Sequence, residues 1–121
     1  MNRMGKVYLV NAFSLNMLKE FPTNLTVDKI DRDEFCLKLE ARLEDNELVN
    51  AIGHDSTVNL INKLCEVQLQ KNRIEVKMNE GDRALVIMIA ERLPEGKVLS
   101  DTEIEDMYKQ GKISFYEVIL G

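Results

Sequence analysis

Two short, continuous apolar runs constrain the fold of this 121-residue chain more than any other feature. The first, KVYLVNAF at residues 6–13, is rich in β-branched and aromatic residues, which predicts a buried strand. The second, RALVIMIAER at residues 83–92, predicts a mostly apolar strand. RIEVKM at residues 73–78 alternates apolar and polar residues, and the turn residues NEGD separate it from the second run. We therefore expect residues 73–78 and 83–92 to pair as a β-hairpin.

Helical patterns separate the strands. The helices are expected over LNMLKEF (residues 15–21, ending at Pro22), DRDEFCLKLEARL (residues 31–43), a segment that begins after His54, and DTEIEDMYKQ (residues 101–110). Ser14, Asp31 and Ser100 are the expected N-caps of three of them, and Asp55 or Ser56 that of the helix after His54.

Three more strand patterns complete the chain. They are LTVDKI (residues 25–30), LVNAI (residues 48–52, a short strand or an extended arm) and KISFYEVIL (residues 112–120). The alternation of strands and helices predicts an α/β fold in which helices flank a mixed β-sheet. The length predicts a single domain over residues 1–121, with residues 1–5 expected to be disordered or dispensable because Met4 is a second potential start.

The charge balance excludes one class of function. Lys and Arg total 16 against 21 Asp and Glu, so the formal net charge is -5. This sign is wrong for a protein that coats nucleic acid without sequence preference, and a polyanion must meet a local basic patch. The chain has no apolar run of about 18 residues and no leader pattern, so we expect a soluble intracellular protein without a membrane span.

The two cysteines are expected to be buried thiols. Cys36 and Cys65 lie far apart in the sequence, with no CxxC motif and no neighbouring histidine, so their spacing argues against a zinc site. A disulfide stays open as the alternative, because intracellular disulfides occur in hyperthermophiles.

The only histidine, His54, lies in the stretch NAIGHDSTVNLI (residues 50–61). Signatures such as a Walker loop, GxGxxG, GxSxG or HExxH are absent. A loop after glycine can present an imidazole to a cleft, and a nearby helix N-terminus attracts anions, which suits phosphate chemistry. The pattern alone nevertheless favours a loop histidine without catalytic duty, just as Arg73 and Arg92 are by default surface charges and Ser14 a helix cap.

Four sequence blocks resemble a known family, and this resemblance favours a catalytic role for His54. VYLVNAFSLNML, NAIGHDSTVNLIN, QKNRIEVKM and ERLPEGK occur in this order and spacing, and together they resemble the viral ring nuclease family. These are small type III anti-CRISPR proteins carried by archaeal viruses, a turreted icosahedral virus of Sulfolobus among them, and by related mobile elements. The resemblance extends from about residue 6 to residue 119.

The resemblance implies an activity and an assembly. It implies that the chain binds cyclic tetra-adenylate, the second messenger of type III CRISPR complexes, and cleaves it to linear di-adenylate without a metal or other cofactor. It also implies an α/β homodimer that holds the ring across its two-fold axis, because an isologous dimer offers the same contacts to opposite halves of a symmetric ring. The protein is then expected in the host cell cytoplasm, where it shuts down CRISPR signalling.

The resemblance also implies which residues act. The catalytic residues are His54, Arg92 and Glu95. The ligand-binding residues are Asn11, Ser14, Asn16, Ser56, Thr57 and Arg73, with Lys71 as a further source of positive charge. A protonated His54 is expected to donate a proton to the departing 5'-oxygen, and Arg92 to stabilise charge on the phosphate oxygens. Glu95 either positions the 2'-hydroxyl or holds Arg92, and the preceding Pro94 leaves its placement open.

Two other functions stay open at this stage. One is a nucleic-acid-binding viral regulatory protein in which Lys71, Arg73 and Arg92 grip a DNA backbone, and this alternative predicts a steep salt dependence. The other is a noncatalytic sponge that binds cyclic oligoadenylate and releases it intact.

Overall fold

The computed structural model describes residues 5–91, 93 and 98–121. Its strands are β1 (Val7–Val10), β2 (Leu25–Ile30), β3 (Leu48–Asn50), β4 (Arg83–Ile89) and β5 (Ile113–Leu120). Its helices are α1 (Arg32–Glu44), α2 (Asp55–Cys65) and α3 (Asp101–Lys109), with a short 3₁₀ helix, η1 (Leu15–Met17), after β1. No helix among these residues is both long enough and apolar enough to cross a membrane.

The strands form one mixed sheet in the order β2-β5-β4-β1-β3. β1 lies between β3 and β4 and is parallel to both, whereas β5 is antiparallel to β4 and β2. The predicted α/β fold with a mixed sheet and flanking helices is confirmed. Because β1, β3 and β4 are parallel, their carboxyl ends meet at the same end of the sheet.

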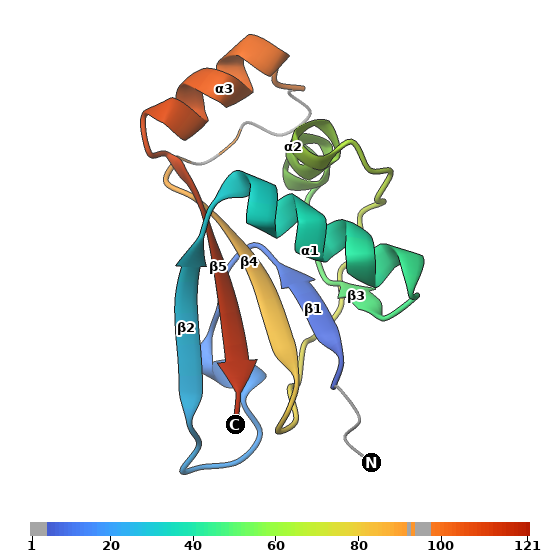
Figure 1. Ribbon diagram of the computed structural model, residues 1–121, viewed down its shortest axis with the longest axis vertical. Coiled ribbons are helices and arrows are strands. Elements are labelled where there is room, and N and C mark those ends of the chain that lie inside the picture. Colours follow the sequence, from blue (N-terminus) through green and yellow to red (C-terminus); the bar gives the residue numbers. More distant parts are fainter. Residues whose placement is uncertain (1–4, 92, 94–97) are drawn as a thin grey trace.

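The helices lie on one face and at one end of the sheet: α1 crosses the strands, α2 lies between α1 and α3, and α3 lies beyond the end at which β5 begins (Figure 1). Phe35 of α1 packs against Phe115 of β5, with ring centroids 4.6 Å apart. Leu39 of α1 and Ile61 of α2 are fully buried in the same cluster as Leu9 of β1. Burial of these side chains removes apolar area from water and holds both helices on the sheet.

The segment over residues 73–78 does not form the predicted hairpin. β4 already has a neighbour on each side, so no free edge is left to pair with this segment. The segment instead lies against the sheet face opposite the helices, where Val76 and Met78 are buried while Ile74 is 41% exposed. Its one bridge joins Met78 to Leu18. The alternating pattern therefore reflects burial of one side of an extended segment, and the hairpin prediction is wrong.

The predicted helix at residues 15–21 is reduced to the three residues of η1. Ser14 caps it as expected, since its Oγ accepts a hydrogen bond from the backbone N–H of Asn16 at 3.2 Å. The prediction of a longer helix failed because Leu15 and Phe21 are 68% and 66% exposed, so their spacing does not mark a buried helix face. Pro22 also disfavours a helical conformation of Phe21.

Cys36 and Cys65 form a disulfide, so the expectation of two thiols is wrong and the alternative that the sequence left open is the one observed. Their sulfur atoms lie 2.08 Å apart and their Cα atoms 5.1 Å apart. The bond joins α1 to the last residue of α2, because the two helices meet at this point on the sheet. Residues 1–4, the greater part of the segment expected to be disordered, lie outside the described residues.

Candidate functional site

A cavity of about 270 Å³ lies where the carboxyl ends of the parallel strands meet. Its lining residues come from three segments of the chain: Asn11, then His54, Ser56 and Thr57, then Ile89, Glu91 and Leu93. These segments follow or end β1, β3 and β4, the three strands that run in the same direction. The carboxyl end of parallel strands is the usual place for a ligand in an open α/β sheet.

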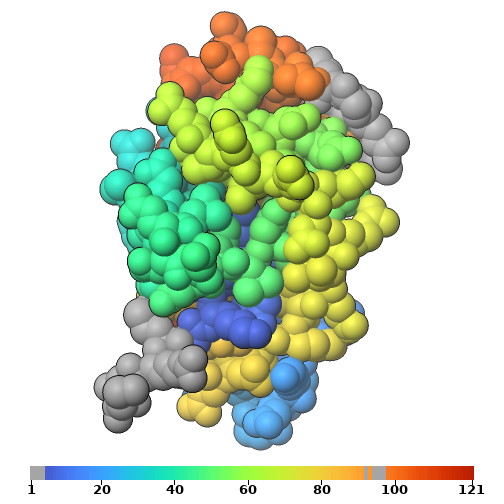
Figure 2. Space-filling view, turned by 90° about the vertical axis from the view of Figure 1, so that its right-hand side faces the viewer, coloured from blue at the N-terminus to red at the C-terminus, as the bar shows by residue number. Residues whose placement is uncertain are grey.

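The backbone that leads from β3 to His54 is fixed by a neighbouring segment. The Asn72 backbone N–H donates to the carbonyl of Ile52 at 2.8 Å, and its side-chain amide donates to the carbonyl of Asn50 at 2.7 Å. The Asn50 side chain accepts from the Ile52 N–H at 3.0 Å and donates to the carbonyl of Gln70 at 2.6 Å. Figure 2 shows the segment after α2, in yellow, beside the green of this loop.

His54 is the N-cap residue of α2. Its backbone is extended, and its carbonyl accepts the first helical hydrogen bond from Val58 at 3.1 Å. Its side chain makes no cap hydrogen bond, so the exposed imidazole is not used to hold the helix. The expectation that Asp55 or Ser56 caps this helix is therefore wrong by one or two residues, because the helix already begins at Asp55.

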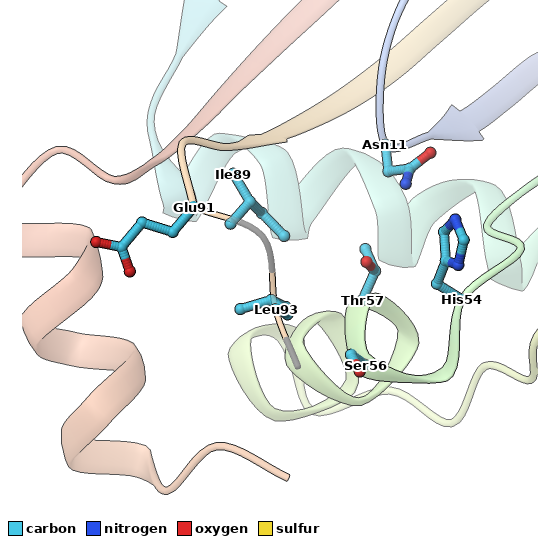
Figure 3. Close-up of a pocket in the computed structure, with 7 residues that line it drawn as sticks. All are labelled: Asn11, His54, Ser56, Thr57, Ile89, Glu91 and Leu93. Atoms are coloured by element: carbon cyan, nitrogen blue, oxygen red, sulfur yellow. The ribbon is translucent and has the colours of Figure 1, made fainter. Parts of the chain in front are cut away.

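The first turn of α2 forms one wall of the cavity. Figure 3 shows the ring of His54 beside this turn, with Ser56 and Thr57 in the turn and the Asn11 amide across from them. Thr57 is 6% exposed although it is polar. The backbone N–H groups and dipole at a helix N-terminus favour an anion, so this wall suits a phosphate group.

Arg73 packs against the loop directly before His54. A Cβ atom at Gly53 would lie only 3.2 Å from Nε and 3.3 Å from Cβ of Arg73. Lys71 approaches the same loop, with its Nζ 3.4 Å from Oδ2 of Asp55. The two basic side chains therefore adjoin the His54 loop, although neither lines the cavity.

Glu91 is a cavity residue that the sequence reasoning missed. Its Oε1 lies 2.6 Å from Nζ of Lys112, and Figure 3 shows its carboxylate directed away from His54. This ion pair offsets the negative charge of Glu91 at the rim. Ile89 is an apolar lining residue. Its place in the alternating pattern of β4 could have indicated that it lies at the cavity, whereas no sequence pattern indicated this for Glu91 or Leu93.

The structure brings four of the proposed site residues together and separates others from them. Asn11, His54, Ser56 and Thr57 line the cavity. Ser14 and Asn16 do not; Ser14 caps η1, and the carbonyl of Asn16 within η1 accepts a hydrogen bond from Nζ of Lys77 at 2.6 Å. Arg92 and Glu95 lie outside the described residues, as does Pro94. Within the described part of the chain, no three His, Cys, Asp or Glu side chains gather as a metal site would need.

Comparison with known proteins gives consistent matches over almost the whole chain. A family model described as STIV B116-like matches residues 7–116. The solved structure of B116 of Sulfolobus turreted icosahedral virus is 75% identical, with a TM-score of 0.92, and the match covers 95% of this chain and 99% of that one.

Two curated viral relatives are also similar. The uncharacterised protein ORF116 of Acidianus filamentous virus 1 is 46% identical over 109 residues, which is 90% of each chain. The uncharacterised protein ORF117 of Acidianus two-tailed virus is 30% identical over 93 residues, 77% of each chain.

Proposed function

This chain belongs to the STIV B116-like family, and we propose that it is a ring nuclease that binds cyclic tetra-adenylate and cleaves it to linear di-adenylate. The cavity at the carboxyl ends of β1, β3 and β4 is the observation that carries the proposal. The cavity brings together the His54 imidazole, which makes no capping hydrogen bond, a helix N-terminus and short polar side chains. These groups suit the binding and transfer of a phosphate group. The resemblance of four sequence blocks to viral ring nucleases supplies the substrate.

The proposed reaction needs only the substrate and side chains. The 2'-hydroxyl of an adenosine attacks its own 3'-phosphate, so that a bond forms between the 2'-oxygen and phosphorus while the bond to the 5'-oxygen breaks. The 2'-hydroxyl releases its proton to solvent, and protonated His54 gives one to the departing 5'-oxygen. The product ends in a 2',3'-cyclic phosphate. General-acid assistance of this kind contributes about 10²- to 10⁴-fold, or roughly 3 to 5 kcal/mol of barrier.

The other residues have supporting roles in this proposal. Ser56, Thr57 and Asn11 hold the phosphate and the ribose in line for attack, which lowers the barrier by fixing the reacting atoms in place. Arg92 stabilises charge on the phosphate oxygens, and Glu95 positions the 2'-hydroxyl or holds Arg92. Arg73 and Lys71 supply positive charge beside the His54 loop.

The size of the cavity favours a shared ligand. About 270 Å³ is slightly below the range of about 300–1,000 Å³ that encloses a drug-sized molecule, and a ring of four nucleotides is larger than such a molecule. One chain can therefore enclose only part of the ring. A homodimer with its two-fold axis through the ring would present two such cavities to opposite halves of the ring. In this assembly, Ser14, Asn16 and Arg73 of either copy can contact the parts of the ring that lie outside the cavities. The host cell cytoplasm, where the messenger is made, is the proposed place of action.

The test is an assay of ring opening. The purified protein is incubated with radiolabelled cyclic tetra-adenylate in EDTA, and the products are separated by chromatography. We expect linear di-adenylate with 2',3'-cyclic phosphate ends. Tight binding with an intact ring would show a sponge instead, and neither binding nor cleavage, together with salt-sensitive binding of duplex DNA, would favour the nucleic-acid-binding alternative.

A further inference from the structure

A second cavity, of about 150 Å³, lies between α1 and the sheet. It is lined by Val7, Lys38, Ala41, Arg42, Arg83, Leu85 and Glu117. Val7 and Arg83 are the first residues of β1 and β4, whereas the His54 cavity lies at the other ends of these strands. The seven residues of β4 separate the two by roughly 20 Å, at about 3.3 Å per residue. The second cavity is therefore a separate feature of the molecule.

Cationic side chains dominate the lining of this cavity. Lys38, Arg42 and Arg83 contribute three positive charges, and among the described residues Glu117 is the one carboxylate that lines it. The lining thus carries an excess of positive charge, although the formal net charge of the chain is -5. The exposed carboxylates of Glu34 and Glu47 pair with Lys38 at 3.3 Å and with Arg42 at 2.9 Å, but neither carboxylate lines the cavity. Exposed pairs of this kind are weak and screened by salt.

Glu117 holds two of the cations in place. Its side chain is 9% exposed, with Oε1 at 2.7 Å from Nζ of Lys38 and Oε2 at 3.5 Å from a guanidinium nitrogen of Arg83. A single contact at 3.5 Å is long for a charged hydrogen bond, and a guanidinium carries five N–H donors in a planar fork. Arg83 can therefore keep Glu117 as a partner while it binds a second anion bidentately.

We propose that this cavity binds a small oxyanion of the phosphate class, either inorganic phosphate or the terminal phosphate of a phosphomonoester. The buried side chains of Val7 and Leu85 line the cavity on the side of the core, which limits its size and lowers the local dielectric. Arginine forks recognise phosphate oxygens in pairs, and Lys38 adds a point charge. The proposal does not rest on the ring nuclease activity and uses none of its residues.

The test is a phosphate titration followed by the backbone amide signals in NMR spectra, at constant ionic strength with chloride as the compensating anion. We expect saturable shifts at the start of β4 and in α1. Arg83→Gln should weaken phosphate binding at least tenfold, and so should Arg42→Gln, which leaves both contacts of Glu117 intact. Arg32→Gln, which removes a cation paired with Glu105 elsewhere, is the matched control and should bind phosphate as the wild type does.

Ribose 5-phosphate serves as a second probe. Tighter binding of inorganic phosphate assigns the cavity to the free ion, and tighter binding of ribose 5-phosphate assigns it to a terminal phosphate. Shifts that do not saturate, or that Arg83→Gln and Arg42→Gln leave unchanged, overturn the proposal. Loss of phosphate binding in His54→Ala would also overturn it, because the ion would then lie in the other cavity.

Discussion

Asp82 is a buried carboxylate whose partners are backbone donors. Its Oδ1 accepts the N–H of Lys6 at 2.9 Å and its Oδ2 accepts the N–H of Asn79 at 2.7 Å, so it fixes both the approach to β1 and the turn before β4. We expect Asp82→Ala to lower the free energy of unfolding by about 2 to 4 kcal/mol, because two donors lose a charged acceptor. Urea unfolding measures this loss. Asp82→Asn, which keeps one carbonyl acceptor, should lose less, and an equal loss in both variants would contradict the account.

Glu105 is tied to Arg32 by a charged hydrogen bond of 2.8 Å. The Arg32 guanidinium holds the pKa of the Glu105 carboxyl below its ordinary value. A lowered pKa means that the pair stabilises the fold above the unfolded-state pKa and that this contribution is lost as the pH falls through the folded-state value. We expect Arg32→Gln to raise the pKa of Glu105 in an NMR titration of its carboxyl carbon. Lys38→Gln, which removes a cation from another ion pair, should leave that titration unchanged.

The sequence could place some cavity residues but not others. His54 could be singled out from the residues alone because a glycine and a helix start flank it, whereas Asn11, Ser56 and Thr57 were named as site residues only through the resemblance to a family; all four line the cavity. The packing of Arg73 on Gly53 was not predicted, since it depends on where residues 70–73 cross the loop. A pattern within one segment carries no information about a contact between two segments.

At the level of elements, the starts of α1 and α3 were predictable because their capping signals are local. Ser100 Oγ accepts the N–H of Glu103 at 3.2 Å while the Glu103 carboxylate accepts the N–H of Ser100 at 3.0 Å, the capping box that the sequence indicated. Asp31 likewise accepts the N–H of Glu34 at the start of α1. The hairpin at residues 73–92 failed because strand pairing is decided by competition, and β5 takes the neighbouring position along β4.

The disulfide links α1 to α2, two helices that are far apart in the sequence and also share one hydrophobic cluster. It closes a loop with a sequence separation of 29, which in the chain-entropy account stabilises the fold by about 3 to 4 kcal/mol. We expect the reduced protein to melt at a temperature lower by roughly 10 °C or more than the oxidised protein. Calorimetry with and without reductant measures the difference. The Cys36→Ser, Cys65→Ser double variant should show no effect of reductant, and equal melting of oxidised and reduced wild type would contradict the prediction.

At the scale of the whole molecule, the shared-ligand proposal requires a dimer. One chain has a mass of 13.9 kDa, and light scattering after size-exclusion chromatography should give twice this value. The reason is that a cavity of about 270 Å³ encloses only part of the ring, so that two copies are needed. A mass of one chain, both alone and with cyclic tetra-adenylate present, would contradict the assembly. The dimer was predicted only from the resemblance of the sequence to a family, since no residue pattern in the chain indicates an interface.

The most direct test of the central claim is the single-turnover rate of cyclic tetra-adenylate cleavage by the wild type and by His54→Ala, in EDTA. The cavity presents His54 without a structural duty, so we predict a rate lower by about 10² to 10⁴ in the variant, with unchanged ligand affinity. Gln68→Ala, at an exposed position beyond α2, is the control and should cleave at the wild-type rate. Equal cleavage rates for the wild type and His54→Ala would contradict the account, because His54 would then not be the proton donor.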